Sequence, residues 1–300
     1  MTTPLLYLLH EGESGDALAR VKIVEGAAAR AGIAFVTLDS RTFDYSAPPS
    51  LRAGDMLFNV GRGGMRLEAL LMRPFVAGFR AYGPTMVTNG DDTTLLALAH
   101  EQLGMPQPRT IHRLPATNDA LPSYVDALNG FPLVLKQADG TLGVGVMIVE
   151  SMRSLRSIVD FLRTTGHEFI LREYIEPQHV GRLCVLGGRV VASLKYAIDP
   201  DDFRGLPYRS GGSPMSFGAR AETLAIDASR AAGHDFTGVD ILIDKAGDPW
   251  LLEVNGPSNF VAYERDLGIP IGDMIVAHLK ARSDAVLAAR EHESRPAPQP

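Results

Sequence analysis

The chain lacks several features that would place it in common classes of protein. It has a single cysteine, Cys184, which excludes an internal disulfide and a cysteine metal cluster, and this usage fits a reducing cytoplasm. No apolar run approaches the roughly 20 residues needed to span a bilayer, so no membrane role is expected. The net charge of −6 argues against a general nucleic-acid binder, which would carry a basic stripe.

Common catalytic motifs are also missing. The sequence contains no G-x-x-x-x-G-K-[ST] loop, no G-x-G-x-x-G after a strand, no H-E-x-x-H and no G-x-S-x-G. The usual forms of the P-loop, of the Rossmann site, of zinc proteases and of serine hydrolases are therefore excluded. What remains is an ordinary globular composition, with 45% apolar residues, and a length that allows two or three subdomains.

Roughly the first 88 residues alternate short apolar segments with helical ones. Strands are predicted at 4–9, 33–38, 55–60 and 84–89, and helices at 15–31 and 65–81. Strands that alternate with helices indicate a parallel, doubly wound sheet, so the first domain is expected to be α/β. A helix at 91–104 and a linker at 105–110 are expected to follow it.

After the linker the pattern changes to hairpins. Strands are predicted at 132–136, 145–151 and 168–175, strand pairs at 181–198 and 238–255, and helices at 153–165 and 271–289. The expected fold class is therefore an α/β domain followed by an α+β region, with a disordered tail at 291–300.

The strand that ends in Glu253, Val254 and Asn255 carries polar residues where a buried strand would not need them. Glu253 and Asn255 are two residues apart and should share one face. Trp250, Leu252 and Val254 should then lie on the other face. Burying an unpaired carboxylate costs several kcal/mol, so either the polar face is exposed or something cationic lies against it.

A third oxygen-bearing residue is expected across the same hairpin. Counting outward from the turn places Asp240 roughly opposite Glu253, so two carboxylates and the Asn255 amide converge on one face. Oxygen ligands of this kind suit Mg²⁺, which takes one or two carboxylates and completes its shell with water and phosphate. The alternative is a solvent-facing strand pair with scattered polar residues, and the apolar neighbours of these residues count against it.

The predicted hairpin that begins at 132 offers a partner for such a site. Lys136 ends a strand and precedes a loop with Gly140, Gly143 and Gly145. Glycines let backbone N–H groups approach phosphate oxygens closely, and a lysine adds a positive charge. The alternative is an exposed hairpin with a solvated lysine.

The segment 170–177, ILREYIEP, is a third element of interest. The backbone at the edge of a strand can bind an adenine, and a carboxylate such as Glu176 can accept from ribose hydroxyls. A plain amphipathic strand is the alternative when this segment is taken alone.

The order of these segments resembles the ATP-grasp ligases, and most closely their RimK-type group, which joins amino acids to peptide or protein carboxylates. The resemblance runs over about residues 85–280 and rests on PLVLKQADGTLGVGV, FILREYIE, GRLCVLGGRVVASLK and GVDILIDKAGDPWLLEVNGPS. It implies an N-terminal domain at 1–88, a central ATP-grasp subdomain with a glycine-rich lid at 89–175, a C-terminal subdomain with the metal site at 176–290 and the tail at 291–300.

The resemblance implies a role for each matched residue. Asp240, Glu253 and Asn255 would bind metal, with Glu253 bridging two Mg²⁺ ions, and Mn²⁺ is an alternative. Lys136 would contact the ATP phosphates under a lid at 140–145, the backbones of Glu173 and Ile175 would bind adenine, and the Glu176 carboxylate would lie near the ribose. The full set of implied nucleotide-binding residues is Lys136, Gly140, Thr141, Gly143, Gly145, Glu173, Tyr174, Ile175 and Glu176.

Three basic residues match positions that act on the substrate. Arg182 would steady the phosphoryl and acyl groups, and Lys195 and Arg209 fall where relatives keep basic groups for the substrate. One departure concerns Thr93, which stands where family members carry a lysine that helps to bind ATP phosphates.

The activity that the resemblance implies is that of an ATP-dependent carboxylate–amine ligase. It would form an amide bond through an acyl phosphate, release ADP and phosphate, and act on amino acids or peptides rather than on nucleic acid or membranes. The expected assembly is a homodimer or a homotetramer. Two alternatives remain, namely an ATP-grasp kinase-like phosphotransferase and a non-catalytic nucleotide-binding module.

Overall fold

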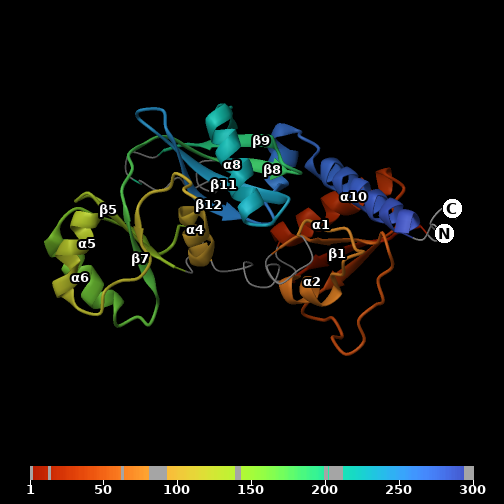
Figure 1. Ribbon diagram of the computed structural model, residues 1–300, viewed down its shortest axis with the longest axis horizontal. Coiled ribbons are helices and arrows are strands. Elements are labelled where there is room, and N and C mark those ends of the chain that lie inside the picture. The colour runs from red at the N-terminus through yellow and green to blue at the C-terminus, as the bar shows by residue number, and fades with distance from the viewer. Residues whose placement is uncertain are drawn as a thin grey trace, which may run out of the picture.

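The computed structural model of the protein describes residues 3–12, 15–61, 64–80, 93–138, 143–198, 202 and 212–293. Three sheets, each covered by helices, make up this part of the chain (Figure 1). No helix within it is both long and apolar enough to cross a membrane. The fold class is the predicted one, with an α/β layer first and antiparallel sheets after it.

The N-terminal sheet is parallel. Its strands are β1 (Leu6–His10), β2 (Phe35–Asp39) and β3 (Met56–Asn59), in the order β2-β1-β3. The helices α1 (Gly15–Arg30) and α2 (Met65–Leu71) follow β1 and β3. A parallel pair needs a crossover between its strands, and α1 is the crossover between β1 and β2. The described strands confirm the expected parallel sheet, and the predicted strand at 84–89 lies outside the described residues.

The predicted helix at 65–81 is too long. α2 ends at Leu71, and its C-cap residue Met72 already has extended backbone angles of −62° and 138°. Pro74 follows, and a proline disfavours helical angles in the residue before it, Arg73. The chain then runs beside β3, where Ala77 forms a parallel bridge with Met56.

The central sheet is antiparallel and carries two helices on one face. Its strands, in the order β4-β7-β5-β6, are β4 (Thr110–Ile111), β5 (Leu133–Gln137), β6 (Val146–Val149) and β7 (Phe169–Glu173). The 3₁₀ turn η2 (Asn118–Ala120) leads into α5 (Leu121–Ala127), and α6 (Met152–Leu162) follows β6. Leu133, Leu135 and Leu171 pack with both helices. The helix α4 (Thr93–Gln102) precedes this sheet, and the predicted linker ends where β4 begins.

The C-terminal sheet is the largest. Its strands, in the order β10-β9-β8-β11-β12, are β8 (Pro177–Leu186), β9 (Arg189–Tyr196), β10 (Gly212–Pro214), β11 (Phe236–Asp244) and β12 (Pro249–Asn255). The helix α8 (Ala219–Ala231) packs on one face. The other face packs towards the N-terminal sheet and towards α9 (Val261–Leu267) and α10 (Ile271–Glu293).

The predicted tail begins too early. α10 runs to Glu293, so residues 291–293 are helical, because the chain has no helix-breaking residue before Pro296. The rest of the tail lies outside the described residues. The predicted boundaries of the domain and subdomains remain a prediction.

A β-bulge alters which residues of β12 share a face. Asp240 pairs with Glu253 as predicted, but the next pair is Ile241 with Leu251, so Leu252 is an extra residue in the strand. An extra residue shifts the alternation of all residues on one side of it. The pairing of the two carboxylate-bearing residues is thus confirmed, while the prediction for the rest of the strand needs correction.

Burial shows the result of this shift. Leu251 and Val254 pack under α8, whereas Trp250 and Leu252 pack with the apolar residues on the opposite side of the sheet, the side that carries Asp240. The predicted facing was therefore right for Val254 and wrong for Trp250 and Leu252.

Candidate functional site

A cleft lies where the central sheet and α4 approach the edge strand β12 of the C-terminal sheet. One part of its wall is apolar and the other carries charge, which is the usual make-up of a small-molecule site. Among the residues that line it are Leu96, Gln107, Lys136, Ile170, Arg172 and Glu253.

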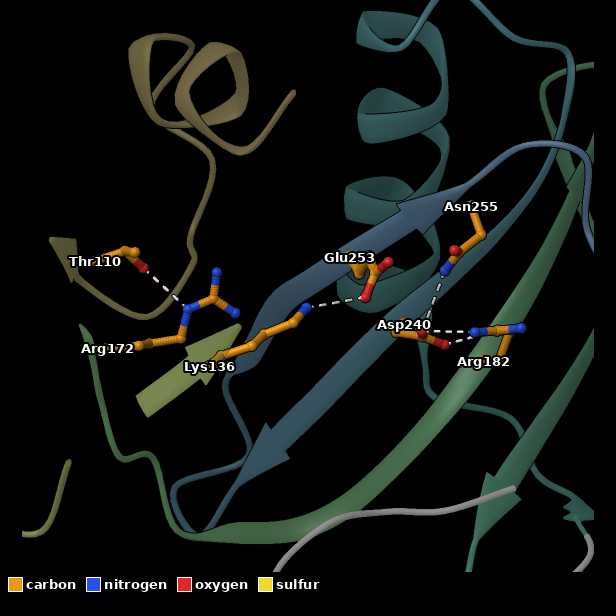
Figure 2. A network of polar contacts seen from close by, with 7 residues as sticks. All are labelled: Thr110, Lys136, Arg172, Arg182, Asp240, Glu253 and Asn255. Carbon is orange, nitrogen blue, oxygen red and sulfur yellow. Dashed lines mark hydrogen bonds and ion pairs between the residues drawn. The ribbon is translucent and has the colours of Figure 1, made fainter. Parts of the chain in front are cut away.

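Lys136 and Glu253 connect the two sides of this cleft. Lys136 Nζ donates to Glu253 Oε2 at 3.3 Å, although the residues are 117 positions apart in the chain. Figure 2 shows the lysine reaching from β5 towards the carboxylate on β12. Both side chains are largely buried, at 20% and 27% exposure. Of the two arrangements that the sequence allowed for Glu253, the structure therefore has the one with a cation against it.

Arg182 and Asp240 form a second ion pair on the same sheet. The guanidinium donates from Nε to Oδ1 and from Nη2 to Oδ2, each at 2.7 Å. Burial alone would lower the pKa of Arg182, but the charge of Asp240 and its hydrogen bonds raise that pKa well above its ordinary value. A two-point contact of this kind fixes both side chains in orientation as well as in position.

Asn255 joins this group from the end of β12. Its Nδ2 donates to Asp240 Oδ2 at 3.4 Å, as drawn in Figure 2. Asp240, Asn255 and Glu253 thus lie together on two neighbouring strands, as the sequence predicted. No group of three or more His, Cys, Asp or Glu placed to hold a metal occurs in the part of the chain that the structure describes.

The chemistry of this residue set nevertheless fits Mg²⁺. Mg²⁺ takes one or two carboxylates and keeps water or phosphate for the rest of its shell, so it needs no complete protein cage. Asp240 and Glu253 offer two carboxylates, and Asn255 offers an amide oxygen if its side chain turns over. In the structure, the cationic side chains of Lys136 and Arg182 neutralise the two carboxylates.

The segment expected to bind adenine is partly committed to other contacts. The Glu173 carboxylate accepts from the Arg109 amide at 2.7 Å and from Asn129 Nδ2 at 2.9 Å, and the Glu173 amide donates to the Arg109 carbonyl. The side chain and the amide of Glu173 therefore hold the central sheet together. The groups predicted to contact adenine are therefore reduced to the carbonyl of Glu173 and the backbone of Ile175.

The two residues beside Ile175 differ in exposure. Burial raises the pKa of the Tyr174 hydroxyl, with the Glu176 carboxylate adding to the effect. Glu176 is exposed and pairs with Lys245 at 2.7 Å, on the turn between β11 and β12. The carboxylate predicted to meet a ribose is thus exposed and is held beside the turn between β11 and β12.

The glycine-rich loop is described only at its end. Gly143 and Gly145 have φ angles of 71° and 76°, which residues with a side chain rarely adopt. A Cβ on Gly145 would lie 2.8 Å from the Cβ of Gln137. The backbone at this end of the loop therefore requires glycine, whereas Gly140 and Thr141 lie outside the described residues.

Lys195, one of the two other basic residues of the prediction, does not lie on the face that carries the ion pairs. Lys195 pairs with Gly181, and Arg182 pairs with Leu194, so Lys195 lies on the opposite face of the sheet from Arg182. The structure thus corrects the placement of Lys195, because the sheet separates it from the ion pairs. Arg209 is not among the described residues.

The sequence interpretation missed Arg172. This residue lines the cleft from β7, and its Nε donates to Thr110 Oγ1 at 2.9 Å. It lies two positions after Ile170, which pairs with Lys136, so strand alternation alone could have placed it on the same face as Lys136.

Comparison with known proteins gives a family match over most of the chain. A family model described as the RimK-like ATP-grasp domain matches residues 93–279. A probable alpha-L-glutamate ligase of Pseudomonas entomophila (strain L48) is 30% identical over 193 residues, which are 63% of this chain and 62% of that protein. A ribosomal protein bS6–L-glutamate ligase of Shigella boydii serotype 4 (strain Sb227) is 31% identical over 182 residues, 60% and 59% of the two chains. The match thus spans about three-fifths of each relative's length.

Solved structures share the fold at low sequence identity. The ATP-grasp ligase PsnB complexed with a minimal precursor superposes with a TM-score of 0.70 at 14% identity, over 93% of this chain and 99% of that chain. D-alanine–D-alanine ligase from Bacillus anthracis gives 0.66 at 17% identity, over 97% and 100%. The architecture described above is therefore that of the ATP-grasp ligases.

Proposed function

The chain belongs to the RimK-like ATP-grasp family, and on this premise we propose that it is an ATP-dependent ligase that joins an amino acid to the carboxylate of a peptide or protein. One observation carries this proposal. Lys136 Nζ, from the predicted phosphate-binding strand, lies 3.3 Å from Glu253 Oε2, on the predicted metal-binding strand, across the cleft. A nucleotide bound there would lie between two groups that suit its phosphates and its metal.

The cleft supports nucleotide binding by its composition. Leu96, Ile170 and Leu252 supply apolar surface for a base, and Lys136 supplies charge for phosphates. The proposed adenine contacts are the Glu173 carbonyl and the Ile175 backbone, at and just after the end of β7, where they follow the cleft residue Arg172. The division at residues 88, 175 and 290 belongs to the same proposal.

The proposed metal ligands are Asp240, Glu253 and Asn255. Bound Mg²⁺ would neutralise the charge that develops on the phosphoryl oxygens. The two ion pairs of the structure would open for this purpose, with Lys136 turning from Glu253 to a phosphate and Arg182 turning from Asp240 to the reacting group. Both side chains are long enough to reorient about several bonds, and a phosphate accepts charge-assisted hydrogen bonds as a carboxylate does.

The reaction proceeds in two steps. A carboxylate oxygen of the substrate attacks the γ-phosphorus, the bond to ADP breaks, and an acyl phosphate forms. The amine of the second substrate then attacks the acyl carbon, phosphate leaves with the bonding electrons, and the amine loses a proton. Arg182 would stabilise the oxyanion of the second step.

This route needs no covalent nucleophile from the protein, and the structure supplies no reason to invoke one. Cys184 is fully buried, and burial raises the pKa of its thiol to about 12. A thiol with so high a pKa forms almost no thiolate at neutral pH and is a poor nucleophile.

The substrate classes follow from the relatives. Two relatives are named for ligating L-glutamate, and one structural neighbour was solved with a precursor peptide. We therefore expect an amino acid as one substrate and a peptide or protein carboxylate, or an amino acid carboxylate, as the other.

Release of ADP in the presence of candidate substrates tests the proposal. A ligase should release ADP fully only when a carboxylate and an amine are both present, and should yield a hydroxamate when hydroxylamine replaces the amine. A stable phosphorylated product without hydroxamate would indicate a phosphotransferase instead. Binding of ATP with no product from any pair would indicate a nucleotide-binding module.

A further inference from the structure

Arg172 points into the nucleotide cleft from the strand next to Lys136. On the antiparallel pair β5 and β7, Lys136 lies opposite Ile170 and Val134 lies opposite Arg172. Residues that alternate along a strand share a face, so Arg172 is on the cleft face with Lys136 and Ile170. Figure 2 shows its guanidinium on the same side of the sheet as the lysine.

The guanidinium of Arg172 is held in one orientation. Its Nε donates to Thr110 Oγ1 on β4 at 2.9 Å. This hydrogen bond uses only Nε, and the two Nη groups are the other donors of the guanidinium. Thr110 is itself oriented, because its hydroxyl donates to the Pro108 carbonyl at 2.9 Å. A hydroxyl can position a guanidinium but cannot neutralise its charge.

The charges around the cleft favour an anion. Among its described lining residues, Lys136 and Arg172 are permanently cationic and Glu253 is anionic. Glu253 accepts from Lys136 and its charge also acts on Arg172, so a single carboxylate faces two cations in this lining. Burial lowers the pKa of Arg172 and the Glu253 charge opposes that shift, but a guanidinium stays protonated in either case.

Resting on the proposed function, we propose that Arg172 is a nucleotide-binding residue that donates from its Nη groups to the phosphate nearest the ribose. Lys136 reaches towards Glu253, at the metal end of the cleft. Arg172 directly precedes Glu173, the first of the proposed adenine contacts, so it lies nearer the base than Lys136 does. It would thereby supply the phosphate contact that the family resemblance assigns to a lysine at the position of Thr93.

Binding of AMP, ADP and adenosine to Arg172→Gln tests the inference without any turnover. A charge-assisted hydrogen bond to phosphate predicts a loss of about ten- to a hundredfold in ADP and AMP affinity by calorimetry. Adenosine has no phosphate, so its affinity should stay within about threefold of the wild-type value by the same reasoning. Arg172→Lys should recover part of the loss, because it restores the charge without the planar fork.

Two further variants separate a phosphate contact from a structural role. Arg113→Gln is the matched control, because Arg113 is 82% exposed in the same sheet region and pairs only weakly with Glu168 at 3.4 Å. It should bind ADP as the wild type does. Thr110→Val should weaken ADP binding by a few-fold in the wild-type background and not at all in Arg172→Gln, because it acts through the guanidinium.

Each outcome decides a different point. An equal loss of adenosine and AMP affinity, or unchanged ADP affinity in Arg172→Gln, would overturn the assignment of Arg172 to a phosphate. If Arg172→Gln does not fold, Arg172→Lys and Thr110→Val carry the test. A wild-type protein that binds neither ATP nor ADP with Mg²⁺ would instead overturn the proposed function itself.

Discussion

Arg182 and Asp240 lie directly opposite each other on neighbouring antiparallel strands and share two hydrogen bonds of 2.7 Å. The guanidinium therefore covers both oxygens of a carboxylate that the proposed mechanism assigns to a metal. The same side chain is assigned to the reacting oxyanion. These two assignments are compatible only if Arg182 leaves Asp240 during the reaction cycle.

Replacing Arg182 by lysine should impair turnover more than nucleotide binding. Lysine keeps the charge but cannot make a two-point contact with Asp240 or with an oxyanion. We expect kcat to fall about tenfold or more, because losing an oxyanion contact raises the activation free energy by up to several kcal/mol. The Kd of Mg-ATP should change by less than about threefold. Steady-state kinetics and calorimetry check this, and a larger loss in Kd than in kcat would contradict the assigned role.

Glu253→Gln should nearly abolish turnover. The amide keeps the shape of the side chain but removes the charge that a bridging metal ligand needs. Glu168→Gln is the matched control, because Glu168 is an exposed carboxylate whose ion pair with Arg113 contributes at most about 1 kcal/mol. ADP release with Mg²⁺ present measures both, and wild-type turnover in Glu253→Gln would remove this residue from the metal site.

The Lys136–Glu253 pair should show coupling in the ligand-free protein and loss of ATP binding when broken. Lys136→Met keeps the length of the side chain and should weaken Mg-ATP binding about ten- to a hundredfold. In urea unfolding, the double variant Lys136→Met/Glu253→Gln should be more stable than the sum of the single variants predicts, by about 1 kcal/mol. Additive effects would mean that the contact contributes nothing to the ligand-free fold.

Gly145→Ala should destabilise the end of the glycine-rich loop more than Gly166→Ala destabilises its own turn. Both glycines have positive φ angles, 76° and 72°, so both variants carry a backbone cost of about 1–2 kcal/mol. Only at Gly145 does the added Cβ meet another residue, Gln137, at 2.8 Å, whereas nothing lies within 4 Å at Gly166. Unfolding of the two variants should differ by the cost of that contact, and ADP release should fall only in Gly145→Ala.

Acid should destabilise the fold through His234. Burial lowers the pKa of this histidine to about 3, with the Arg80 charge adding to the effect, and its Nδ1 accepts from the Phe236 amide. Between pH 3 and 6.5 the unfolded chain therefore binds a proton that the folded one does not, so the free energy of unfolding decreases as pH falls through this range.

The size of this effect can be measured by comparison with a variant. From pH 7 to pH 5 His234 should account for a decrease of about 2 kcal/mol in the free energy of unfolding. Urea unfolding at the two pH values should show a smaller decrease in His234→Gln than in the wild type. An equal decrease in both proteins would mean that His234 is not kept neutral by the fold.

Local pairing could be predicted from sequence where a short turn fixes the register. The Asp240–Glu253 pair lies only a few residues from its turn, and counting outward found it. Simple alternation failed between the turn and this pair, at Trp250 and Leu252, because a bulge at Leu252 shifts the alternation by one. A bulge depends on packing against both faces of the sheet, and no sequence signal in this hairpin marks it.

Lys195 shows the same effect on β9. Counting outward from the Gly187-Gly188 turn pairs Lys195 with Val180 and would place it on the face of Arg182. A register shift between Cys184 and Val185 moves Lys195 opposite Gly181 instead, and hence to the other face. The contact between Lys136 and Glu253 could not be predicted by counting residues from a turn, because it joins two different sheets. No local sequence pattern encodes how those sheets are placed relative to each other.

The two ion pairs of the resting site have a consequence for the order of assembly. Each carboxylate assigned to the metal already has a cationic partner from the chain, so free Mg²⁺ must compete with Lys136 and Arg182 before it can bind. A nucleotide that arrives with its metal brings anionic phosphates for those two side chains and a cation for the two carboxylates at once. The carboxylates and the cationic side chains then exchange their partners, and no buried charge is left without an opposite charge. The site is therefore expected to bind the magnesium complex of ATP in preference to free Mg²⁺ or free ATP.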